Sequence, residues 1–468
     1  MRTESDSLGP VRIPADAYWG AQTQRAIANF PVSGITFPPV FIRSLALIKH
    51  ACADVNRDLR LLDRRFAHAI IRSCEEIVDG KFEGQFPLDI FQTGSGTSTN
   101  MNVNEVIATR SNEIITGTKQ TTAPVHPNDH VNMGQSSNDV IPSTIHVAAV
   151  LQAEELLLPS LKLLQRSIRT QSRKNDSVVK TGRTHLMDAM PLTIGQELSG
   201  WESQIAGARR EIQRALPRLA ELAIGGTAVG TGINAPKGFG GRVVRRLSRL
   251  TERDFREAPN HFAAQASQDA VAAFSGQLRA LATALIKIAN DLRWMSSGPM
   301  AGLGEIRLPA LQPGSSIMPG KVNPVIPEAV RMAAAQVMGN DTVVAVANAM
   351  GEFQLNVMLP VIAHNLLQEI TILATSTRLL AGWAIDGMEV NDEHIRESLL
   401  RNPIIATVLN PVIGYEKAAE VVKKSLAEKK SVKEVVLELG YLTKEEADRI
   451  LDPAGMTGPR RVRQKERE

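Results

Sequence analysis

The sequence predicts an all-α fold. The chain is 43% hydrophobic but only 4% aromatic, and its abundance of Ala and Leu favours helices over sheets built from aromatic and β-branched residues. Several stretches also keep a helical pattern over about 24 to 33 residues, which corresponds to roughly 36 to 50 Å of helix. They run approximately over 192–223, 265–296, 327–350 and 356–388, after an earlier one that begins near residue 137 and bends at Pro159.

Helix length also predicts the assembly. These helices are roughly two to three times the usual length, and a single bundle of them leaves apolar faces exposed unless subunits pack together. We therefore expect an oligomer. The 468 residues also exceed what one core serves, about 250 to 300 residues. We expect three domains, over 1–137, 138–390 and 391–468.

Charge and cysteine usage exclude several classes of protein. The formal net charge is +4, and the terminal segment RRVRQKERE supplies +3 of it through five basic and two acidic residues, so the body is nearly neutral. A nucleic-acid-binding protein normally has its excess of basic residues on a face or stripe of the fold, whereas here the excess lies in a terminal tail. Cys52 and Cys74 lack metal or redox spacing and are expected to be buried in a reducing compartment. The polar N-terminus fits no signal peptide, and no apolar run approaches the roughly 18 residues of a membrane span. We expect a cytoplasmic protein that binds neither nucleic acid nor membrane.

The N-terminal part begins with irregular structure and a hairpin over residues 1–35, followed by helices over 40–58 and 61–78. The segment GSGTSTNMNVNEVIATR then predicts a glycine-rich loop and a helix that ends near Gly117. Ser95 and Thr97 therefore lie at a helix N-terminus, where free N–H groups and the helix dipole attract anions. An ordinary Ser/Thr cap is the simpler interpretation of the same residues.

The segment VHPNDH contains two histidines, His126 and His130, four residues apart. Such spacing on a helix would suggest a metal pair. Pro127 and the turn at Asn128 and Asp129 disfavour a helix there, so we expect no metal site.

A second helix start follows in QSSND. Ser136, Ser137 and Asn138 lie just before a helix whose first turn is expected to contain Pro142. This is a second helix N-terminus lined with hydrogen-bond donors.

Two further loops connect the long helices. KTGRTHLMDAMP (180–191) places Thr184 and His185 in a loop, although a lone loop histidine is more often structural or solvated than catalytic. GGTAVGTGIN (225–234) approximates a phosphate-binding loop but lacks the required lysine, so we interpret it as a flexible connector.

The most informative stretch is GSSIMPGKVNP (314–324). Its two glycines and two prolines prevent it from continuing as helix or strand, so it is a loop. The hydroxyls of Ser315 and Ser316, the cation of Lys321 and the amide of Asn323 would each need a partner in a core. They suit a loop that holds an anion.

The chain ends in shorter helices from about residue 391. Ser431 with Glu434 and Thr443 with Glu446 have the spacing of capping boxes. We expect a small accessory domain there.

The polar segments all occupy the same kind of position in the predicted fold, a junction between a loop and a helix. If those helix N-termini converge, they form a pocket of N–H dipoles, hydroxyls, one histidine and one lysine. No metal cluster, nucleotide loop or cysteine nucleophile accompanies it, so we expect no cofactor and no metal. Such a pocket fits a small dicarboxylate best.

The pattern GSSxMPxKxNP at 314–324 resembles the signature of the fumarase/aspartase superfamily, whose members eliminate across C–O or C–N bonds to give fumarate. PADAYWGAQTQRA, GSGTSTNMNVNEVIA, VHPNDHVNMGQSSND, GRTHLMDAMPLT, IGGTAVGTGIN and GEFQLNVMLPVI extend the resemblance, over nearly the whole chain, to class II fumarases. That resemblance implies a three-domain helical fold and a homotetramer whose active sites are each built from three subunits. It also implies metal-free interconversion of malate and fumarate through an aci-carboxylate.

The resemblance also assigns residue roles. Ser315 would be the base, Lys321 and Asn323 would stabilise the aci-carboxylate, and His185, oriented by Glu328, would protonate the departing hydroxyl through a water. The residues expected to hold the substrate carboxylates are Ser95, Thr97, Ser136, Ser137, Asn138, Thr184 and Ser316, with Lys321 and Asn323. A secondary dicarboxylate site would comprise His126, Pro127, Asn128 and Asp129, with Ala123 and Pro124 in place of the family's upstream basic residue.

Two alternatives remain open. Aspartate ammonia-lyase shares the serine loop, but Gly320, the Ser136–Ser137 doublet and GGTAVGTG resemble fumarases, whereas aspartases tend to have Ala, Ser-Thr and GATAIGTG there. The other is a non-catalytic paralogue whose basic tail binds nucleic acid. The presence of Ser315 and His185, together with the rest of the predicted machinery, gives no reason to expect inactivity.

Overall fold

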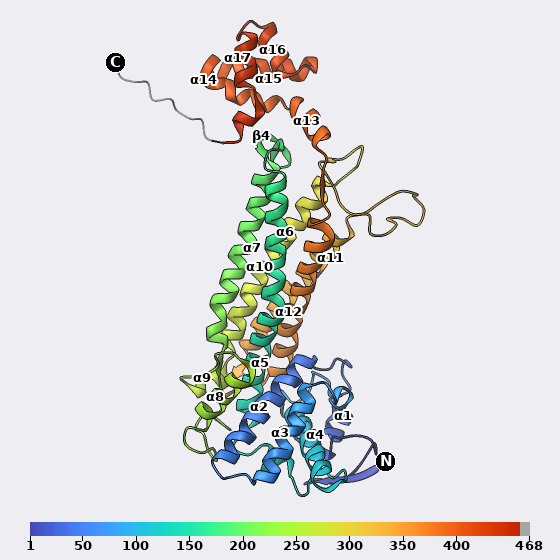
Figure 1. Ribbon diagram of the computed structural model, residues 1–468, viewed down its shortest axis with the longest axis vertical. Coiled ribbons are helices and arrows are strands. Elements are labelled where there is room, and N and C mark those ends of the chain that lie inside the picture. The colour runs from blue at the N-terminus through green and yellow to red at the C-terminus, as the bar shows by residue number, and fades with distance from the viewer. Residues whose placement is uncertain (459–468) are drawn as a thin grey trace, which may run out of the picture. The chain divides into compact units, whose positions relative to one another are not determined.

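The computed structural model describes residues 1–458, so the basic segment 460–468 lies outside the described residues. The all-α prediction is confirmed (Figure 1). Residues 1–458 contain seventeen α-helices, and their ten short strands form only two-stranded sheets.

The bounds of each element are as follows. The helices are α1 (Ala21–Asn29), α2 (Pro39–Asp58), α3 (Arg64–Val78), α4 (Thr97–Thr116), α5 (Ser137–Gln152), α6 (Leu158–Lys174), α7 (Ile194–Leu219), α8 (Phe239–Thr251), α9 (His261–Ala266), α10 (Asp269–Met295), α11 (Val325–Asn348), α12 (Leu359–Leu380), α13 (Asp392–Leu400), α14 (Asn410–Ile413), α15 (Tyr415–Glu428), α16 (Val432–Glu438) and α17 (Lys444–Ile450). The strands are β1 (Arg2–Asp6), β2 (Gly9–Ile13), β3 (Val179–Thr184), β4 (Met187–Thr193), β5 (Glu221–Leu222), β6 (Arg256–Glu257), β7 (Ile306–Arg307), β8 (Gly351–Glu352), β9 (Leu355–Asn356) and β10 (Glu389–Val390). Short π or 3₁₀ turns are η1 (Glu83–Gln85), η2 (Pro127–Val131), η3 (Ala153–Leu157), η4 (Ala381–Ile385), η5 (Pro403–Leu409) and η6 (Pro453–Met456).

The chain divides into two compact units. The first comprises Met1–Pro159, Ala208–Ala282 and Ala333–Thr375. The second comprises Ser160–Gly207, Thr283–Met332 and the residues from Ser376 onward. The division into three domains stays a prediction.

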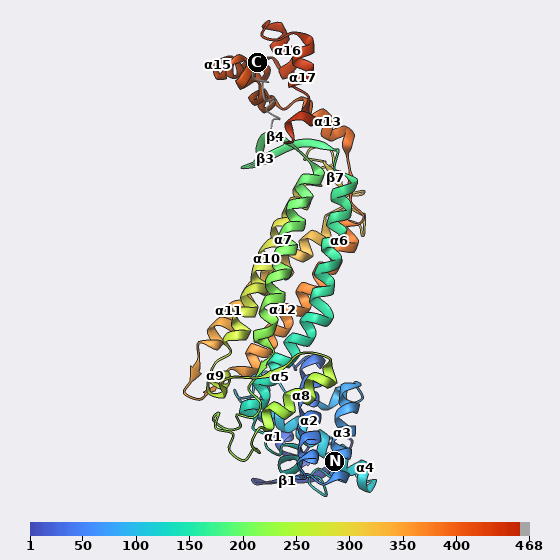
Figure 2. The same cartoon turned by 60° about the vertical axis from the view of Figure 1, so that its left-hand side comes forward.

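Helix α2 is central to the first unit. It packs against α3, α4, α5 and α8, and α2, α3 and α4 lie side by side in both views (Figures 1 and 2). It is buried on nearly all sides, as expected for a helix inside the core, and its buried side chains include Phe41, Leu45, Ile48, Cys52 and Val55. Cys52 is buried and forms no disulfide, as is the case for Cys74 on α3, so the prediction that both are buried is confirmed.

A buried carboxylate of α4 holds the start of α1. Glu105 is 3% exposed and accepts hydrogen bonds from the backbone N–H groups of Gly20 (2.9 Å) and Thr23 (3.1 Å) and from the Thr23 hydroxyl (2.6 Å). A Cβ at Gly20 would lie 2.9 Å from Glu105 Oε1. Burial raises the pKa of Glu105, and these donors replace the water that its carboxylate has lost. The PADAYWGAQTQRA segment is therefore fixed on α4.

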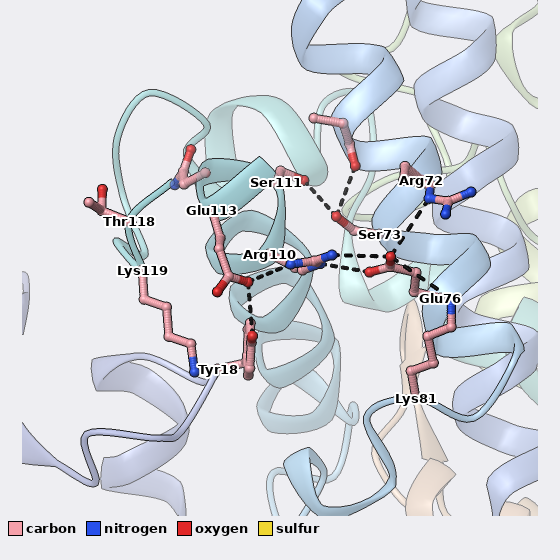
Figure 3. A network of polar contacts seen from close by, with 12 residues as sticks. Tyr18, Arg72, Ser73, Glu76, Lys81, Arg110, Ser111, Glu113, Thr118 and Lys119 are labelled. Carbon is pink, nitrogen blue, oxygen red and sulfur yellow. Dashed lines mark hydrogen bonds and ion pairs between the residues drawn. The ribbon is translucent and has the colours of Figure 1, made fainter. Parts of the chain in front are cut away.

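A polar network joins α3 to α4 (Figure 3). Arg110 donates from Nε to Glu76 Oε2 (2.7 Å) and from Nη1 to Glu113 Oε2 (2.6 Å). The same oxygen of Glu113 accepts from the Tyr18 hydroxyl (2.8 Å). Burial and the bond to Glu113 raise the pKa of Tyr18 to about 12. The network ties the segment before α1 to the helical core.

The predicted long helices are present, with corrected ends. α7 begins at Ile194 because the preceding residues pair as β4 with β3. The predicted helix 265–296 is interrupted at Ser267, whose backbone is extended, and this separates α9 from α10. Pro142 lies inside α5 and not in its first turn, because the cap at Ser136 starts the helix five residues before the proline.

Helix α10 has the length and composition of a membrane-crossing helix, and it is the one such helix within residues 1–458. In its most apolar window, 44% of the residues are buried. Core helices of water-soluble proteins pass the same test.

The C-terminal helices have a core of their own. η5 and α15 to α17 bury a cluster of small and branched apolar side chains, and these helices group together in both views (Figures 1 and 2). The capping boxes at Ser431 and Thr443 are confirmed, since each hydroxyl accepts the N3 backbone N–H and each N3 glutamate accepts the cap N–H. The core members are Ile405, Ala406, Leu409, Ala418, Val421, Val432, Val435, Val436, Leu442, Ala447 and Leu451.

Candidate active site

Hydroxyl groups from two helix N-termini meet in the first unit. Thr97 Oγ1 lies 2.8 Å from Ser95 Oγ and 2.7 Å from Ser137 Oγ. Thr97 is the first residue of α4, and Ser137 is the first residue of α5. The first turns of both helices have backbone N–H groups without partners inside the helix, and the helix dipoles are positive there. The structure therefore joins two anion-attracting positions that lie 40 residues apart in the sequence.

Two glycines shape the loop that leads into α4. Gly96 has a left-handed φ of +72°, which glycine adopts without strain. A Cβ at Gly94 would lie 1.8 Å from the Val357 carbonyl oxygen, and the Gly94 carbonyl accepts a hydrogen bond from the Leu359 N–H (3.0 Å). The glycines thus let the hydroxyl-bearing loop pack on the GEFQLNVMLP segment.

Ser136 caps α5. Its hydroxyl accepts the Asn138 N–H (3.2 Å), and Asp139 Oδ1 accepts the Ser136 N–H (2.9 Å) in a capping box. The Ser136 hydroxyl therefore caps α5, whereas the Ser137 hydroxyl is hydrogen-bonded to the hydroxyl of Thr97.

The GGTAVGTGIN loop packs against this cap. Asp139 Oδ2 accepts the backbone N–H groups of Gly225 (3.0 Å) and Thr227 (2.9 Å). Asn138 Nδ2 donates to the Ala228 carbonyl (2.8 Å). The interpretation of this loop as a flexible connector is wrong, because these hydrogen bonds attach it to the start of α5.

The same loop lines a cavity of about 330 Å³ in the first unit. The charged or titratable side chains of its lining are Lys237, Glu257 and His261, and His261 Nε2 lies 3.4 Å from Glu257 Oε1. One side of the loop is therefore hydrogen-bonded to the start of α5, and the other side lines a polar cavity.

Lys49 is a buried cation that the sequence analysis missed. It is fully buried, and its Nζ donates to Asn132 Oδ1 (2.8 Å) and Gln135 Oε1 (2.9 Å). Asn132 Oδ1 also accepts from the amides of Asn100 and Asn104 on α4 (3.2 Å each). Burial lowers the pKa of Lys49 to about 8. The lysine joins the turn before α5 to α4, and its signal in the sequence was a cation inside the apolar run LALIKHACA.

The segment of the predicted secondary site forms a helical turn. η2 spans Pro127–Val131, so the expectation of a non-helical turn is wrong. His126 explains the difference, because its Nδ1 accepts the N–H groups of Asn128 and Asp129 (3.3 Å each) and caps the turn. The His126 N–H donates to His130 Nδ1 (2.8 Å). Within residues 1–458, no three His, Cys, Asp or Glu side chains are grouped to hold a metal ion.

In the second unit, His185 lies at the tip of a β-hairpin, where the sequence analysis had predicted only a loop. β3 and β4 pair as far as Thr184 and Met187, which leaves His185 and Leu186 as the two turn residues. Their φ values are +56° and +60°, as a type I′ turn requires. A left-handed histidine is strained by roughly 1 to 2 kcal/mol, and the turn projects its side chain into solvent.

A buried glutamate supports the hairpin. Glu305 is 3% exposed and accepts from Lys180 Nζ at Oε2 (2.6 Å) and from Arg183 Nη1 at Oε1 (2.6 Å). Lys180 Nζ also donates to Glu197 Oε2 on α7 (2.8 Å). These charge-assisted bonds fix the strand that carries Thr184 and His185.

The signature loop is closed at its base. The Gly314 N–H donates to the Lys321 carbonyl (2.7 Å), and Asn323 Nδ2 donates to the Gly314 carbonyl (2.7 Å). A Cβ at Gly314 would lie 2.4 Å from the Lys321 carbonyl oxygen, so this closure requires glycine. Asn323 thus holds the loop with one amide hydrogen and keeps a second donor.

The Ser315 hydroxyl oxygen faces two backbone donors. It accepts from the N–H groups of Ile317 (3.2 Å) and Met318 (3.0 Å). Hydrogen bonds of this kind stabilise an alkoxide more than a hydroxyl, because the negative charge is the better acceptor. The loop therefore places two donors where they would stabilise negative charge on the Ser315 oxygen.

The remaining predicted residues of the second unit are accessible. Ser316 and Lys321 are exposed, and Glu328 lies half-buried in the first turn of α11. Within the described part of one chain, no hydrogen bond or ion pair joins His185 to Ser315 or to Glu328. The side chains of the signature loop are thus available to a ligand or to another chain.

Comparison with known proteins gives the family. A lyase family model matches residues 9–339, and a fumarase C C-terminus model matches residues 405–458. A class II fumarate hydratase of Xylella fastidiosa (strain Temecula1) is 54% identical over 97% of this chain and 95% of its own length, and a second one, from Pseudomonas aeruginosa, is 53% identical over 97% and 98%. The crystal structure of class II fumarase from Schistosoma mansoni has a TM-score of 0.95 at 42% identity and covers 97% of this chain and 99% of its own. The chain therefore belongs to the class II fumarase family of lyases.

Proposed function

We propose that this protein reversibly hydrates fumarate to malate. The observation that carries the proposal is the hydroxyl chain of Ser95, Thr97 and Ser137 across the N-termini of α4 and α5. A substrate carboxylate placed there accepts hydrogen bonds from hydroxyl and N–H groups and lies at the positive ends of two helix dipoles. The relatives are named for fumarate, which is a small dicarboxylate. Its carboxylates can accept such hydrogen bonds.

The chemical step follows from the signature loop. In the dehydration direction, the Ser315 alkoxide takes a proton from the carbon beside one carboxylate, and that carboxylate gains a second negative charge. Lys321 supplies the opposite charge, and the free donor of Asn323 supplies a hydrogen bond, so both stabilise the aci-carboxylate. The N–H groups of Ile317 and Met318 donate to the serine oxygen and stabilise the negative charge on it before the transfer.

Departure of the hydroxyl needs an acid. His185, oriented by Glu328, gives a proton through a water to the hydroxyl on the neighbouring carbon, and that hydroxyl leaves as water. The products are fumarate, one water, the neutral imidazole and the protonated serine. Hydration of fumarate is the same sequence reversed.

We further propose a homotetramer in which each active site takes residues from three chains. Two observations support it: Lys321 and Ser316 are exposed in one chain, and His185 has no partner there among the residues of the site. The long helices, with small apolar residues on their faces, supply the subunit interface. We also propose that the enzyme is cytoplasmic and binds neither nucleic acid nor membrane.

The test is formation of fumarate, followed by its ultraviolet absorbance, with malate or aspartate as sole substrate. Malate is expected to react and aspartate is not; fumarate from aspartate alone would make the protein an aspartate ammonia-lyase. Ser315→Ala should lower kcat by about 10²- to 10⁴-fold without changing the oligomer measured by light scattering. Ser199→Ala, an exposed serine on α7, is the control, and near-normal turnover by Ser315→Ala would show that the base is another group.

A further inference from the structure

Helix α8 has a strongly basic face in the first unit. Its apolar side is buried through Phe239, Val243, Val244 and Leu247. Four arginines at positions 242, 245, 246 and 249 follow an i, i+3, i+4, i+7 pattern, which places them on one face of the helix. Most of the polar surface of this helix is therefore guanidinium.

The arginines line an open cavity, and Arg242, Arg245 and Arg249 are exposed. Its volume is about 150 Å³, and its lining consists of Arg242, Arg245, Arg246 and Arg249 of α8 with Val55 and Asp58 of α2. One carboxylate thus faces four guanidinium groups in the lining.

The neighbouring carboxylates are already neutralised. Arg246 donates to Asp58 Oδ2 and pairs with Asp54 Oδ2, both at 2.7 Å. Arg57 pairs with the same two aspartates. These two arginines and two aspartates balance in charge, so the rest of the cavity lining has no anion left to compensate it.

Three arginines have no partner in the part of the chain that the structure describes. Within residues 1–458, the structure gives no ion pair and no hydrogen bond to the side chain of Arg242, Arg245 or Arg249. Neighbours at i+3 and i+4 on a helix lie about 5 to 6 Å apart at Cβ, so the three positive charges repel one another. A bound anion would relieve that repulsion.

We propose that this arginine pocket of α8 binds a small polyphosphate anion with three or more negative charges. Planar guanidinium groups pair bidentately with phosphate oxygens, and a phosphate chain offers several such groups at short spacing. Asp54 and Asp58 hold the Arg246 side chain in position at the cavity. The other three arginines supply the positive charge that binds the anion. A monocarboxylate or dicarboxylate would leave at least one of the three charges uncompensated.

The experiment titrates the full-length protein with inorganic triphosphate by calorimetry at about 0.15 M salt, where the Debye length is about 8 Å. The double variant Arg245→Gln/Arg249→Gln should raise the Kd at least about tenfold, because it removes two charge-assisted contacts. Asp58→Asn should lower the Kd, since it removes the one carboxylate of the lining. Both substitutions leave the proposed active site untouched, so unchanged dehydration of malate reports that the variants are folded.

The matched control is Arg166→Gln/Arg173→Gln, which removes two exposed arginines of α6 that have no side-chain partner among residues 1–458. It should change the Kd for triphosphate by less than about twofold. Equal weakening by the two double variants would show general charge attraction and overturn the proposal. Absence of saturable triphosphate binding would overturn it too, as would tight binding of a single-stranded RNA oligonucleotide that triphosphate does not displace.

Discussion

Thr97 Oγ1 and Ser137 Oγ lie 2.7 Å apart at the N-termini of α4 and α5. Each residue is the first of its helix, so their contact brings two positive helix ends to one place. A carboxylate bound there gains from both dipoles, typically about 0.3 to 1 kcal/mol from each helix. This contact makes the two segments one candidate binding site.

Ser137→Ala is expected to raise KM for malate about tenfold while kcat changes less. The substitution removes a hydroxyl that we assign to a substrate carboxylate, and a hydrogen bond to a charged group contributes about 1.5 to 3 kcal/mol. Steady-state kinetics measure both constants. Thr116→Val, at the exposed C-terminal end of α4, is the control. A fall in kcat with KM unchanged would mean that Ser137 does not bind the ground state.

His185→Asn should lower kcat by about 10²-fold or more and leave the thermal unfolding midpoint nearly unchanged. Asn tolerates the left-handed φ of +56° that this turn requires, so the hairpin keeps its shape while the acid is lost. Turnover and thermal unfolding separate the two effects. His185→Val should in addition destabilise the hairpin, because a β-branched residue resists this φ. If His185→Asn kept full turnover, the acid would have to be another group.

Lys49→Met is expected to remove a pH dependence of stability. In the folded protein burial lowers the pKa of Lys49 to about 8, from 10.5, so between those values the unfolded chain binds more protons. The free energy of unfolding of the wild type should therefore rise between about pH 8 and pH 10.5, and the variant should lack this rise. Unfolding in urea at fixed protein concentration, followed over that range, measures it.

The matched control for Lys49 is Lys162→Met, an exposed lysine on α6. It should leave the pH dependence of the wild type intact. Parallel curves for wild type and Lys49→Met would contradict the assignment of this proton to Lys49.

Glu369→Gln is expected to flatten a second pH dependence, of opposite sign. Burial, with a further contribution from Asp341, raises the pKa of Glu369 to about 9, from 4.5. Ser275 Oγ lies 3.0 Å from both Glu369 oxygens and 2.8 Å from Asp341 Oδ1, and one hydroxyl hydrogen cannot serve two carboxylates. Arg279 pairs with Asp341 (2.8 Å), so the proton resides on Glu369.

The sign of this pH dependence follows from the pH at which the folded and the unfolded chain each lose the proton. The folded protein keeps it up to about pH 9, whereas the unfolded chain releases it near pH 4.5, so stability from this group is complete below about pH 4.5 and declines as pH rises toward 9. Glutamine stays neutral and should abolish the decline, as measured by urea unfolding between pH 5 and pH 9. Glu211→Gln, exposed on α7, should behave as the wild type. An unchanged slope in Glu369→Gln would place the proton elsewhere.

Some features of the fold followed from local patterns. The bounds of α2 and α4 and the capping boxes at Ser431 and Thr443 depend on residues close in the chain, namely apolar period, cap residues and glycine. The break at Ser267 and the hairpin at His185 did not follow. The hairpin needs a left-handed backbone at His185 whose cost the surrounding structure offsets, and the helix breaks at an ordinary extended residue, Ser267. Neither feature is visible in a window of neighbouring residues.

The chemistry of the site divides in the same way. Residue types indicated helix N-termini and a signature loop that suit an anion, and the resemblance to class II fumarases assigned the individual roles: Ser95, Thr97 and Ser137 to the substrate carboxylates, and the serine and lysine of the signature loop to the chemical step. Only the tertiary structure decided that Thr97 meets Ser137, that Asp139 docks the GGTAVGTGIN loop, and that Lys49 is buried against Asn132 and Gln135. The reason is physical: a hydrogen bond between residues distant in sequence forms only after packing has removed water and fixed both partners, and no local preference encodes that distance.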